Sequence, residues 1–337
     1  MGPITVVSGE PTYRGVFGQI DSSRMVVDPV ALPPAPVASG IAPLTGLPLA
    51  DPSTAGRPAI LAKIDNTKKG RPQAGLSQAD MIYEEQIEGG FTRLALVFHT
   101  NAPELIGPVR SGRSTDIALL GSLNHPIFVW SGANTVHGAL LRRHEFVDLG
   151  AATRSEYTRA KDRPGTYDLM TNADNMQSLA AGIGSGGTPP PHFEYRNDVT
   201  GLPATAQPAD SFIVDYPSVA ARWDWDEASQ RWLRTQGGTP HVDADGTQVA
   251  MANVIVAEVG HVATGALDVA GSTVWEEQFL GSGRAWIYTD AHLVEATWTK
   301  PSIDSVATWT TPDGIPVALS PGTTWIELAP GPPESPK

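Results

Sequence analysis

The sequence predicts an α+β protein, in which a mixed α/β domain is followed by a mainly antiparallel β domain. Three observations support this prediction. Between residues 59 and 183, short apolar runs typical of buried strands alternate with helical segments that carry capping residues. From residue 209 onward, aromatic and β-branched residues alternate with polar ones, which is typical of antiparallel strands. A tract rich in proline and glycine separates the two patterns.

These patterns divide the chain into five segments. We expect an extended lead-in at residues 1–41, a mixed α/β ligand-binding domain at 42–186, a Pro/Gly-rich linker at 187–208, an antiparallel β domain at 209–330 and a tail at 331–337. The lead-in ends in "DPVALPPAPVASG", whose prolines favour an extended chain rather than a packed element.

The first domain has elements that can be justified one by one. "AILAKIDN" (residues 59–66) is a short apolar run suited to a buried strand. "MIYEEQIEGGFTRLALVF" (residues 81–98) predicts two strands joined by a turn at Gly89-Gly90. "PIFVWSG" is a further strand, and helices are expected from Ser114, from the capping residue Asn134 and from the capping residue Asn172.

Composition limits the classes of partner and chemistry. The formal net charge of −13 over 337 residues argues against nucleic acid, because no basic stripe is present to release counterions. The absence of cysteine excludes disulfides, thiolate metal sites and cysteine nucleophiles within this chain. No apolar run reaches the length of a membrane span.

"IGPVRSGRSTD" (residues 106–116) is the strongest candidate for a binding site. Arg110 and Arg113 lie among glycine and serine just before the helix expected from Ser114, where free N–H groups favour anions. Two guanidinium groups there, with Ser111 between them, would hold a phosphate or carboxylate by charge-assisted hydrogen bonds. We expect Gly112 to let the backbone approach a ligand closely. The alternative is that both arginines pair with nearby carboxylates and order the loop.

"YEEQIEGGFTR" is the second candidate. Counting by two along the first strand places Glu84 and Glu88 on one face, where they would act as general acid and base or as oxygen ligands of a metal. The alternative is that Arg93, across the hairpin, neutralises one of them as a cross-strand pair.

A third group follows the strand at residues 59–66. Asp65 and Asn66 close that strand, and Arg71 and Gln73 lie in the loop after it. Loops on a rigid scaffold often present functional groups, so these four residues are candidates, although Asp and Asn also close ordinary turns.

Several familiar motifs are missing. The histidines form no zinc-protease pair, and neither a Gly-x-Ser-x-Gly elbow nor a phosphate-binding P-loop is present. "HVDADG" resembles a calcium loop only in part, because the twelfth position is Val254 rather than glutamate. We therefore expect no metal and no cofactor. Eight tryptophans crowd the β domain, either as core packing or as a stacking platform for sugars.

Taken in order, "PLTGLP", "KIDN", "RPQAGLSQADMIYEEQIEGGFTRLALVF", "IGPVRSGRSTDIALL" and "FVWSG" resemble the YerB-type family of bacterial envelope lipoproteins. "PHVDADGTQVAMANVIV", "GSGRAWIYTD" and "LSPGTTWIEL" resemble the β-rich C-terminal partner domain of that family, so the similarity extends over residues 43–329. The family is a domain of unknown function. The resemblance implies a secreted or lipid-anchored protein, in contact with the membrane only through an anchor whose signal segment and cysteine are missing from this sequence.

The recurrent polar positions of the family fall on ten residues of this chain: Asp65, Asn66, Arg71, Gln73, Asp80, Glu84, Glu88, Arg93, Arg110 and Arg113. One departure is relevant to function. Where the family usually has Pro-His-Asn, this chain has Pro164-Gly165-Thr166, so a family chemistry that used the histidine would be lost here.

Three functions follow from these residues. The first is a non-catalytic envelope protein whose N-terminal domain binds an anionic or glycan-like ligand, such as a cell-wall fragment, through Arg93, Arg110 and Arg113. The second is a hydrolase of a cell-wall glycan or phosphodiester, with Glu84 or Glu88 as general acid and Asp65 as base. The third is a scaffold that docks a protein partner through the β domain. The missing histidine and nucleophile motifs favour the first, while enzymatic activity remains an open alternative.

Overall fold

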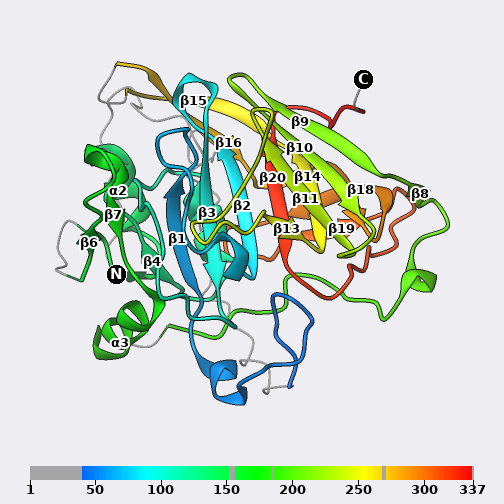
Figure 1. Cartoon of the computed structure of the whole chain (residues 1–337), viewed down its shortest axis with the longest axis horizontal. Coiled ribbons are helices and arrows are strands. Elements are labelled where there is room, and N and C mark those ends of the chain that lie inside the picture. Colours follow the sequence, from blue (N-terminus) through cyan, green and yellow to red (C-terminus); the bar gives the residue numbers. More distant parts are fainter. Residues whose placement is uncertain (1–39, 152–155, 184–185, 268–270, 336–337) are drawn as a thin grey trace, which may run out of the picture.

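One large sheet runs through the whole molecule (Figure 1). The computed structural model describes residues 40–151, 156–183, 186–267 and 271–335. Within these residues the sheet has eleven strands in the order β19-β18-β17-β14-β20-β2-β3-β1-β4-β5, with β8 paired to β18. The strands are β1 (Ile60–Asp65), β2 (Met81–Gln86), β3 (Thr92–Phe98), β4 (Ile127–Val129), β5 (Val147–Asp148), β8 (Gln207–Pro208), β14 (Asn253–Glu258), β17 (Gly281–Thr289), β18 (His292–Lys300), β19 (Thr308–Thr310) and β20 (Thr324–Ala329).

Smaller β elements surround this sheet. A five-stranded sheet packs on one of its faces and contains β9 (Ser211–Tyr216), β10 (Val219–Asp226), β11 (Arg231–Gln236), β12 (Thr239–Pro240) and β13 (Ala250–Met251). β15 (Gly260–Leu267) and β16 (Thr273–Gln278) form a projecting hairpin, and β6 (Thr158–Arg159) pairs with β7 (Leu169–Met170).

The helices are short and lie in the first half of the chain. They are α1 (Asp116–Gly121), α2 (Thr135–Leu141) and α3 (Ala173–Ile183), together with the 3-10 turns η2 (Pro52–Gly56), η3 (Leu76–Gln78), η4 (Glu88–Gly90), η6 (Gly165–Tyr167) and η7 (Val199–Gly201). The two expected asparagine caps are confirmed, because Asn134 accepts from the His137 N–H at 2.9 Å and Asn172 from the Asn175 N–H at 2.8 Å. The helix expected from Ser114 begins at Asp116, whose carboxylate accepts from the Arg113 N–H.

The hairpin predicted at residues 81–98 is confirmed as β2 and β3, which pair antiparallel with Glu85 opposite Arg93. Gly89 and Gly90 both have a φ of 73°, a backbone conformation that glycine adopts without strain. The strand predicted at residues 59–66 is also confirmed, as β1, and it pairs with β3 so that Asp65 lies opposite Arg93. The candidate residues of the first domain therefore lie at one end of three adjacent strands.

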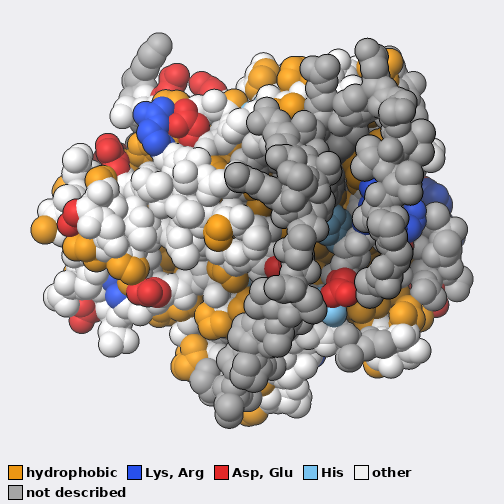
Figure 2. All heavy atoms as spheres, turned by 180° about the vertical axis from the view of Figure 1, so that it is seen from behind, with side chains coloured by type: hydrophobic (Ala, Val, Ile, Leu, Met, Phe, Trp, Pro, Cys, Tyr) orange, Lys and Arg blue, Asp and Glu red, His pale blue; other side chains and the backbone are white. Residues whose placement is uncertain are grey.

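The two halves of the chain share this sheet. β20, near the C-terminal end, pairs in parallel with β2 from Met81↔Thr324 to Glu85↔Leu328, and β14 pairs with the other edge of β20. The predicted α+β class, with a β-rich C-terminal part, is confirmed. Apolar clusters cover both faces of the sheet, one beneath the five-stranded sheet and one beneath α1, α2 and the loops around residues 303–319. Seen from the opposite side, the charged side chains of the described residues are scattered over the visible surface (Figure 2).

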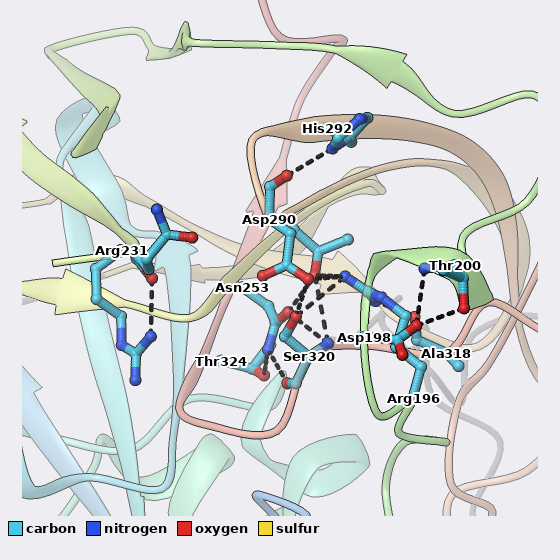
Figure 3. A network of polar contacts seen from close by, with 12 residues as sticks. Arg196, Asp198, Thr200, Arg231, Asn253, Asp290, His292, Ala318, Ser320 and Thr324 are labelled. Carbon is cyan, nitrogen blue, oxygen red and sulfur yellow. Dashed lines mark hydrogen bonds and ion pairs between the residues drawn. The ribbon is translucent and has the colours of Figure 1, made fainter. Parts of the chain in front are cut away.

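The tract predicted as a linker is held against the β-rich half by Arg196 (Figure 3). Its guanidinium donates to the Thr289 Oγ1 at 2.8 Å, to the Asp290 carboxylate at 2.6 Å and to the Ala318 carbonyl at 2.5 Å. The Arg196 N–H also donates to the Leu319 carbonyl. Because Arg196 is buried and both of its terminal nitrogens donate hydrogen bonds, this part of residues 187–208 is a packed segment.

Candidate functional site

Two polar clusters lie on opposite faces of β1, β2 and β3. Neighbouring residues of a strand point to opposite faces, and residues opposite each other in the register share a face. Asp65, Glu85 and Arg93 therefore face one side of the sheet. Glu84 and Leu94 face the other side, toward the five-stranded sheet. The polar residues selected from the sequence are divided between these two faces.

The first cluster contains three arginines, and we call it the arginine cluster: Arg93, Arg110 and Arg113 with Asp65, Glu88 and Ser111. Arg113 makes a bidentate pair with Glu88, with Nε–Oε1 at 3.0 Å and Nη2–Oε2 at 2.7 Å. The Arg110 Nε lies 3.0 Å from the Asp65 Oδ2. Asp65 and Glu88, the two carboxylates of the cluster, are thus each paired with one arginine.

Arg93 differs from the other two arginines. Its side chain is buried, with 4% of the residue exposed, and its Nη1 donates to the Ser111 carbonyl at 3.0 Å. Within the described part of the chain, the Arg93 guanidinium forms no salt bridge, and its Nε has no hydrogen-bond partner. Burial, followed by the positive charges of Arg113 and Arg110, lowers the pKa of Arg93 to about 9. The cluster therefore holds three guanidinium groups against two carboxylates.

Arg110 connects the cluster to the segment where the sequence departs from its family. Its Nη1 donates to the Thr166 carbonyl at 3.2 Å, and its guanidinium carbon lies 5.4 Å from the centre of the Tyr167 ring. The Pro164-Gly165-Thr166 segment is thus a neighbour of the arginine cluster. A Cβ atom at Gly165 would meet no atom within 4 Å, but the φ of 51° at this position is one that favours glycine.

Beneath the arginine cluster lies a buried ion group that the sequence analysis missed. Lys63 on β1 contacts the Glu85 carboxylate and lies 2.8 Å from the Asp116 Oδ1. Burial lowers the pKa of Lys63 to about 8. Counting residues outward from a two-residue turn at Gly89-Gly90 places Gln86 opposite Arg93, one residue away from the observed pairing of Glu85 with Arg93, so the sequence did not give this register.

The β15–β16 hairpin brings a further carboxylate to this face. The Glu277 carboxylate accepts from the Gln86 N–H at 2.5 Å and lies 3.2 Å from the His261 Nε2, and the Glu277 N–H donates to the Thr115 Oγ1. Burial raises the pKa of Glu277 to about 7. No local signal in the sequence links Glu277 to Gln86, because the two residues are 191 positions apart.

The second cluster, on the opposite face, is the Glu84 network: Glu84, Asn66, Gln73, Arg234, His241 and Glu327. The Glu84 carboxylate accepts from the Arg234 Nη2 at 2.6 Å, from the Asn66 Nδ2 at 2.9 Å and from Thr92 at 2.6 Å. Gln73 bonds both Asn66 and His241 at 2.9 Å. All of these side chains are at least nine-tenths buried, so the network joins β2 to β11 in the interior.

Arg234 is the centre of this network. Its Nη1 lies 2.6 Å from both the Gln236 Oε1 and the His241 Nδ1, and its guanidinium carbon lies 4.6 Å from the centre of the Trp325 ring. Glu327 on β20 accepts from the Trp223 and Tyr216 side chains at 2.9 Å. Burial, followed by the charge of Glu84, raises the pKa of Glu327 to about 8.

This geometry corrects three expectations. Glu84 and Glu88 do not share a face, because β2 ends at Gln86 and the chain turns through η4, which carries Glu88 to the Arg113 side. Arg93 lies opposite Glu85 and pairs with neither Glu84 nor Glu88. Gly112 is explained by packing, since a Cβ atom there would lie 2.9 Å from the Trp130 ring.

The remaining candidates lie away from the arginine cluster. Asn66 and Gln73 belong to the Glu84 network, and Arg71 donates to the Gln236 carbonyl at 3.5 Å on the same side. Asp80 accepts from the His99 and Thr100 N–H groups in the interior, and burial raises its pKa. Of the ligand-binding candidates, Arg93, Arg110, Ser111 and Arg113 are brought together, with Asp65 and Glu88 beside them.

Comparison with known proteins identifies the family. Residues 44–185 match the N-terminal domain and residues 212–326 the C-terminal domain of a protein family of unknown function, DUF3048. The chain belongs to this family, as its resemblance to the YerB type predicted. It is 26% identical over 308 residues to the protein described as "Putative lipoprotein YerB" from Bacillus subtilis (strain 168), with 86% of each chain covered.

The fold is shared with a solved structure. The crystal structure of YerB protein from Bacillus subtilis superposes with a TM-score of 0.74 at 24% identity, covering 86% of this chain and 97% of that one. Among the described residues of this chain, no helix is long and apolar enough to span a membrane, and no group of three or more His, Asp or Glu side chains is placed to hold a metal ion.

Proposed function

We propose that this protein acts outside the cytoplasm, at the cell envelope, and binds an anionic or glycan-like ligand through its arginine cluster. The description of the Bacillus subtilis relative as a lipoprotein supports the location. The partner would be a cell-wall fragment or another small anionic molecule. Contact with the membrane would come only from a lipid anchor. The proposal for the site rests on the charges at Arg93, Arg110 and Arg113.

The observation that carries the proposal is the uncompensated guanidinium of Arg93. A buried charge without a partner is costly, and proteins generally pair such charges. Arg110 and Arg113 each have a carboxylate, whereas Arg93 has only the Ser111 carbonyl among the described residues. A phosphate or carboxylate placed between the three guanidinium groups would supply the missing negative charge through charge-assisted hydrogen bonds.

The partial exposure of the outer arginines supports access to the cluster. The Arg110 side chain is 23% exposed and the Arg113 side chain 13% exposed, while Arg93 lies deeper. Asp65 and Glu88 then have a positioning role, because each fixes one guanidinium by hydrogen bonds. Ser111, whose Oγ is 3.4 Å from the Ser131 Oγ, adds a hydroxyl that suits the oxygens of a sugar or phosphate.

The two alternative functions have less support. A hydrolase with Glu84 as general acid and Asp65 as base would need both carboxylates at one site, and they lie on opposite faces of the sheet. Glu88, the other proposed acid, lies on the Asp65 side but is held in a bidentate pair with Arg113. Asp65, the expected base, accepts from Thr67 and pairs with Arg110. A scaffold role would be favoured by one wide apolar patch on the β-rich half, but the exposed large apolar residues described there, such as Leu267 and Ile315, lie on separate elements.

Isothermal titration of inorganic phosphate, phosphosugars and cell-wall fragments tests the proposal. We expect saturable binding of an anionic member by the wild type, and a loss of at least about tenfold in affinity in Arg93→Met and in the Arg110→Ala/Arg113→Ala double variant. Arg222→Ala, which removes an exposed arginine paired with Asp224, is the matched control and should bind as the wild type does. Equal binding by the double variant and the wild type would overturn the proposal.

A further inference from the structure

A cavity lies between the five-stranded sheet and the β17–β18 end of the large sheet, away from the arginine cluster. Its lining comes from β9 and the end of β10, from β17 and β18, and from β8 and residues 333–335. The cavity has a volume of about 650 Å³. This size is typical of cavities that bind small organic molecules. We call it the aromatic cavity, and none of its lining residues belongs to the arginine cluster.

Its walls are rigid aromatic rings. Phe212 from β9 stacks on Tyr288 from β17 with ring centres 3.5 Å apart and an angle of 9°. Trp225 packs edge-on against the buried Trp232 at 5.3 Å, and its indole N–H donates to Glu227 at 2.9 Å. Trp225 and Trp286 are only half-buried, so their rings combine fixed positions with exposed surface.

The charged groups of the lining are all acidic. Asp210 and Glu334 are the two carboxylates, and no Lys, Arg or His is among the described residues that line the cavity. Two arginines on the lining strands β10 and β17 already pair with other carboxylates. Arg284 lies 5.1 Å over the Trp286 ring but makes two hydrogen bonds to the Glu258 carboxylate, and Arg222 pairs with Asp224. The cavity therefore combines electron-rich ring faces with a negative potential.

The backbone holds both carboxylates in place. Glu334 pairs with Ile213 of β9 through two hydrogen bonds of 2.8 Å, so the tail extends the edge of the five-stranded sheet at this point. The Asp210 carbonyl accepts from the Trp225 N–H at 2.7 Å, which ties the acid to the aromatic wall. Neither carboxylate forms a salt bridge within the described residues. Two negative charges are thus presented beside the rings, and of the two Asp210 also interacts electrostatically with Arg222.

We propose that the aromatic cavity binds a small organic cation, a quaternary or protonated amine carried on an apolar body. Aromatic faces attract such a cation, the carboxylates add charge complementarity, and the apolar body fills the cavity. This site is independent of the proposed anion site, because it differs in place, in the sign of its charge and in its residues.

Two matched ligand pairs test the inference in the full chain: choline against its neutral isostere 3,3-dimethyl-1-butanol, and butylamine against 1-butanol. We expect at least one cation to bind saturably, as measured by isothermal titration, and its neutral partner to bind about tenfold more weakly or worse. Asp210→Asn/Glu334→Gln should lose a similar factor, because it removes the charges and keeps the side-chain shapes.

The controls separate this site from the rest of the molecule. Glu104→Gln/Asp162→Asn removes two exposed acids outside the cavity lining and should leave cation binding unchanged, as should Arg93→Met. Equal affinity for cation and neutral partner, unchanged binding in Asp210→Asn/Glu334→Gln, or no binding of either cation at millimolar concentration would each overturn the inference.

Discussion

Arg93 and Arg234 invite a direct comparison, because both are buried arginines beside β2 on opposite faces of the large sheet. Arg93 lies on β3 of that sheet, and Arg234 lies on β11 of the five-stranded sheet that covers the other face. Arg234, 0% exposed, meets the Glu84 carboxylate, a glutamine, a histidine and two indole rings. Arg93, 4% exposed, meets one backbone carbonyl and two further guanidinium groups. The residue type and burial are the same, so the difference lies in the partners. Arg234 joins the two sheets through its partners, whereas Arg93 is the residue on which the proposed anion site rests.

The largest loss of stability is expected when β20 is removed, because the large sheet that carries both polar clusters is then interrupted beside β2. β20 supplies Glu327 and Trp325 to the Arg234 side and pairs with β2 along Met81–Glu85. A chain that ends after residue 208 leaves β2 with an unpaired edge in the middle of the sheet. We expect it to lack a cooperative unfolding transition by circular dichroism. A sharp transition of residues 42–208 alone would instead establish this part as an independent domain.

Arg234→Met should give the next largest effect. It removes one partner from a buried ion pair and leaves Glu84 beside Glu327 without a cation, which typically costs about 3–5 kcal/mol of unfolding free energy. Urea denaturation measures this loss. Arg222→Met, at a pair that is exposed on both sides, is the matched control and should stay close to the wild type. A loss no larger than in that control would show that the Glu84 network does not hold the sheets together.

The free energy of unfolding should also depend on pH because of the Glu84 network. The pKa of Glu327 is about 8 in the folded chain and 4.5 ordinarily, so the folded state keeps a proton that the unfolded state releases. The resulting stabilisation is complete below pH 4.5 and is lost as the pH rises through 8, with a slope of up to about 1.4 kcal/mol per pH unit. Glu277, with a pKa of about 7, contributes in the same direction.

Glu327→Gln tests this assignment. The amide keeps the size of the side chain and cannot ionise, so the fall in urea midpoint between pH 5 and pH 8 should become shallower than in the wild type. Because Glu277 still titrates, some slope should remain. A variant with the slope of the wild type would mean that another group causes the pH dependence.

Local features were predictable from the sequence, and long-range partners were not. The hairpin turn at Gly89-Gly90 and the caps at Asn134 and Asn172 depend on residues a few positions apart, and all three were found. Arg110 and Arg113 were selected because proline, glycine and serine around them signal a loop before a helix. By contrast, Arg234 is 150 positions from Glu84, and nothing in either stretch indicates the other.

The sequence analysis placed Glu88 on the wrong face of the sheet for a different reason. Counting by two holds only while the strand continues, and β2 ends at Gln86. Gly89 then takes a φ of 73° inside η4, which redirects Glu88 to Arg113. The sequence contained the signal for this turn, but the glycines were interpreted as a connection after Glu88 rather than as part of the bend that carries it.

The smallest effect on stability is expected at Arg93, and this prediction separates the two faces. Arg93→Met removes a buried charge that has no carboxylate of its own and relieves its repulsion with Arg110 and Arg113, while Asp65 and Glu88 keep their partners. The lost hydrogen bond to the Ser111 carbonyl opposes this gain. We expect the unfolding free energy to change by less than about 1 kcal/mol, against the 3–5 kcal/mol of Arg234→Met, while anion binding is lost. If Arg93→Met unfolds as readily as Arg234→Met, the Arg93 guanidinium is part of the framework, and the contrast between the two faces is wrong.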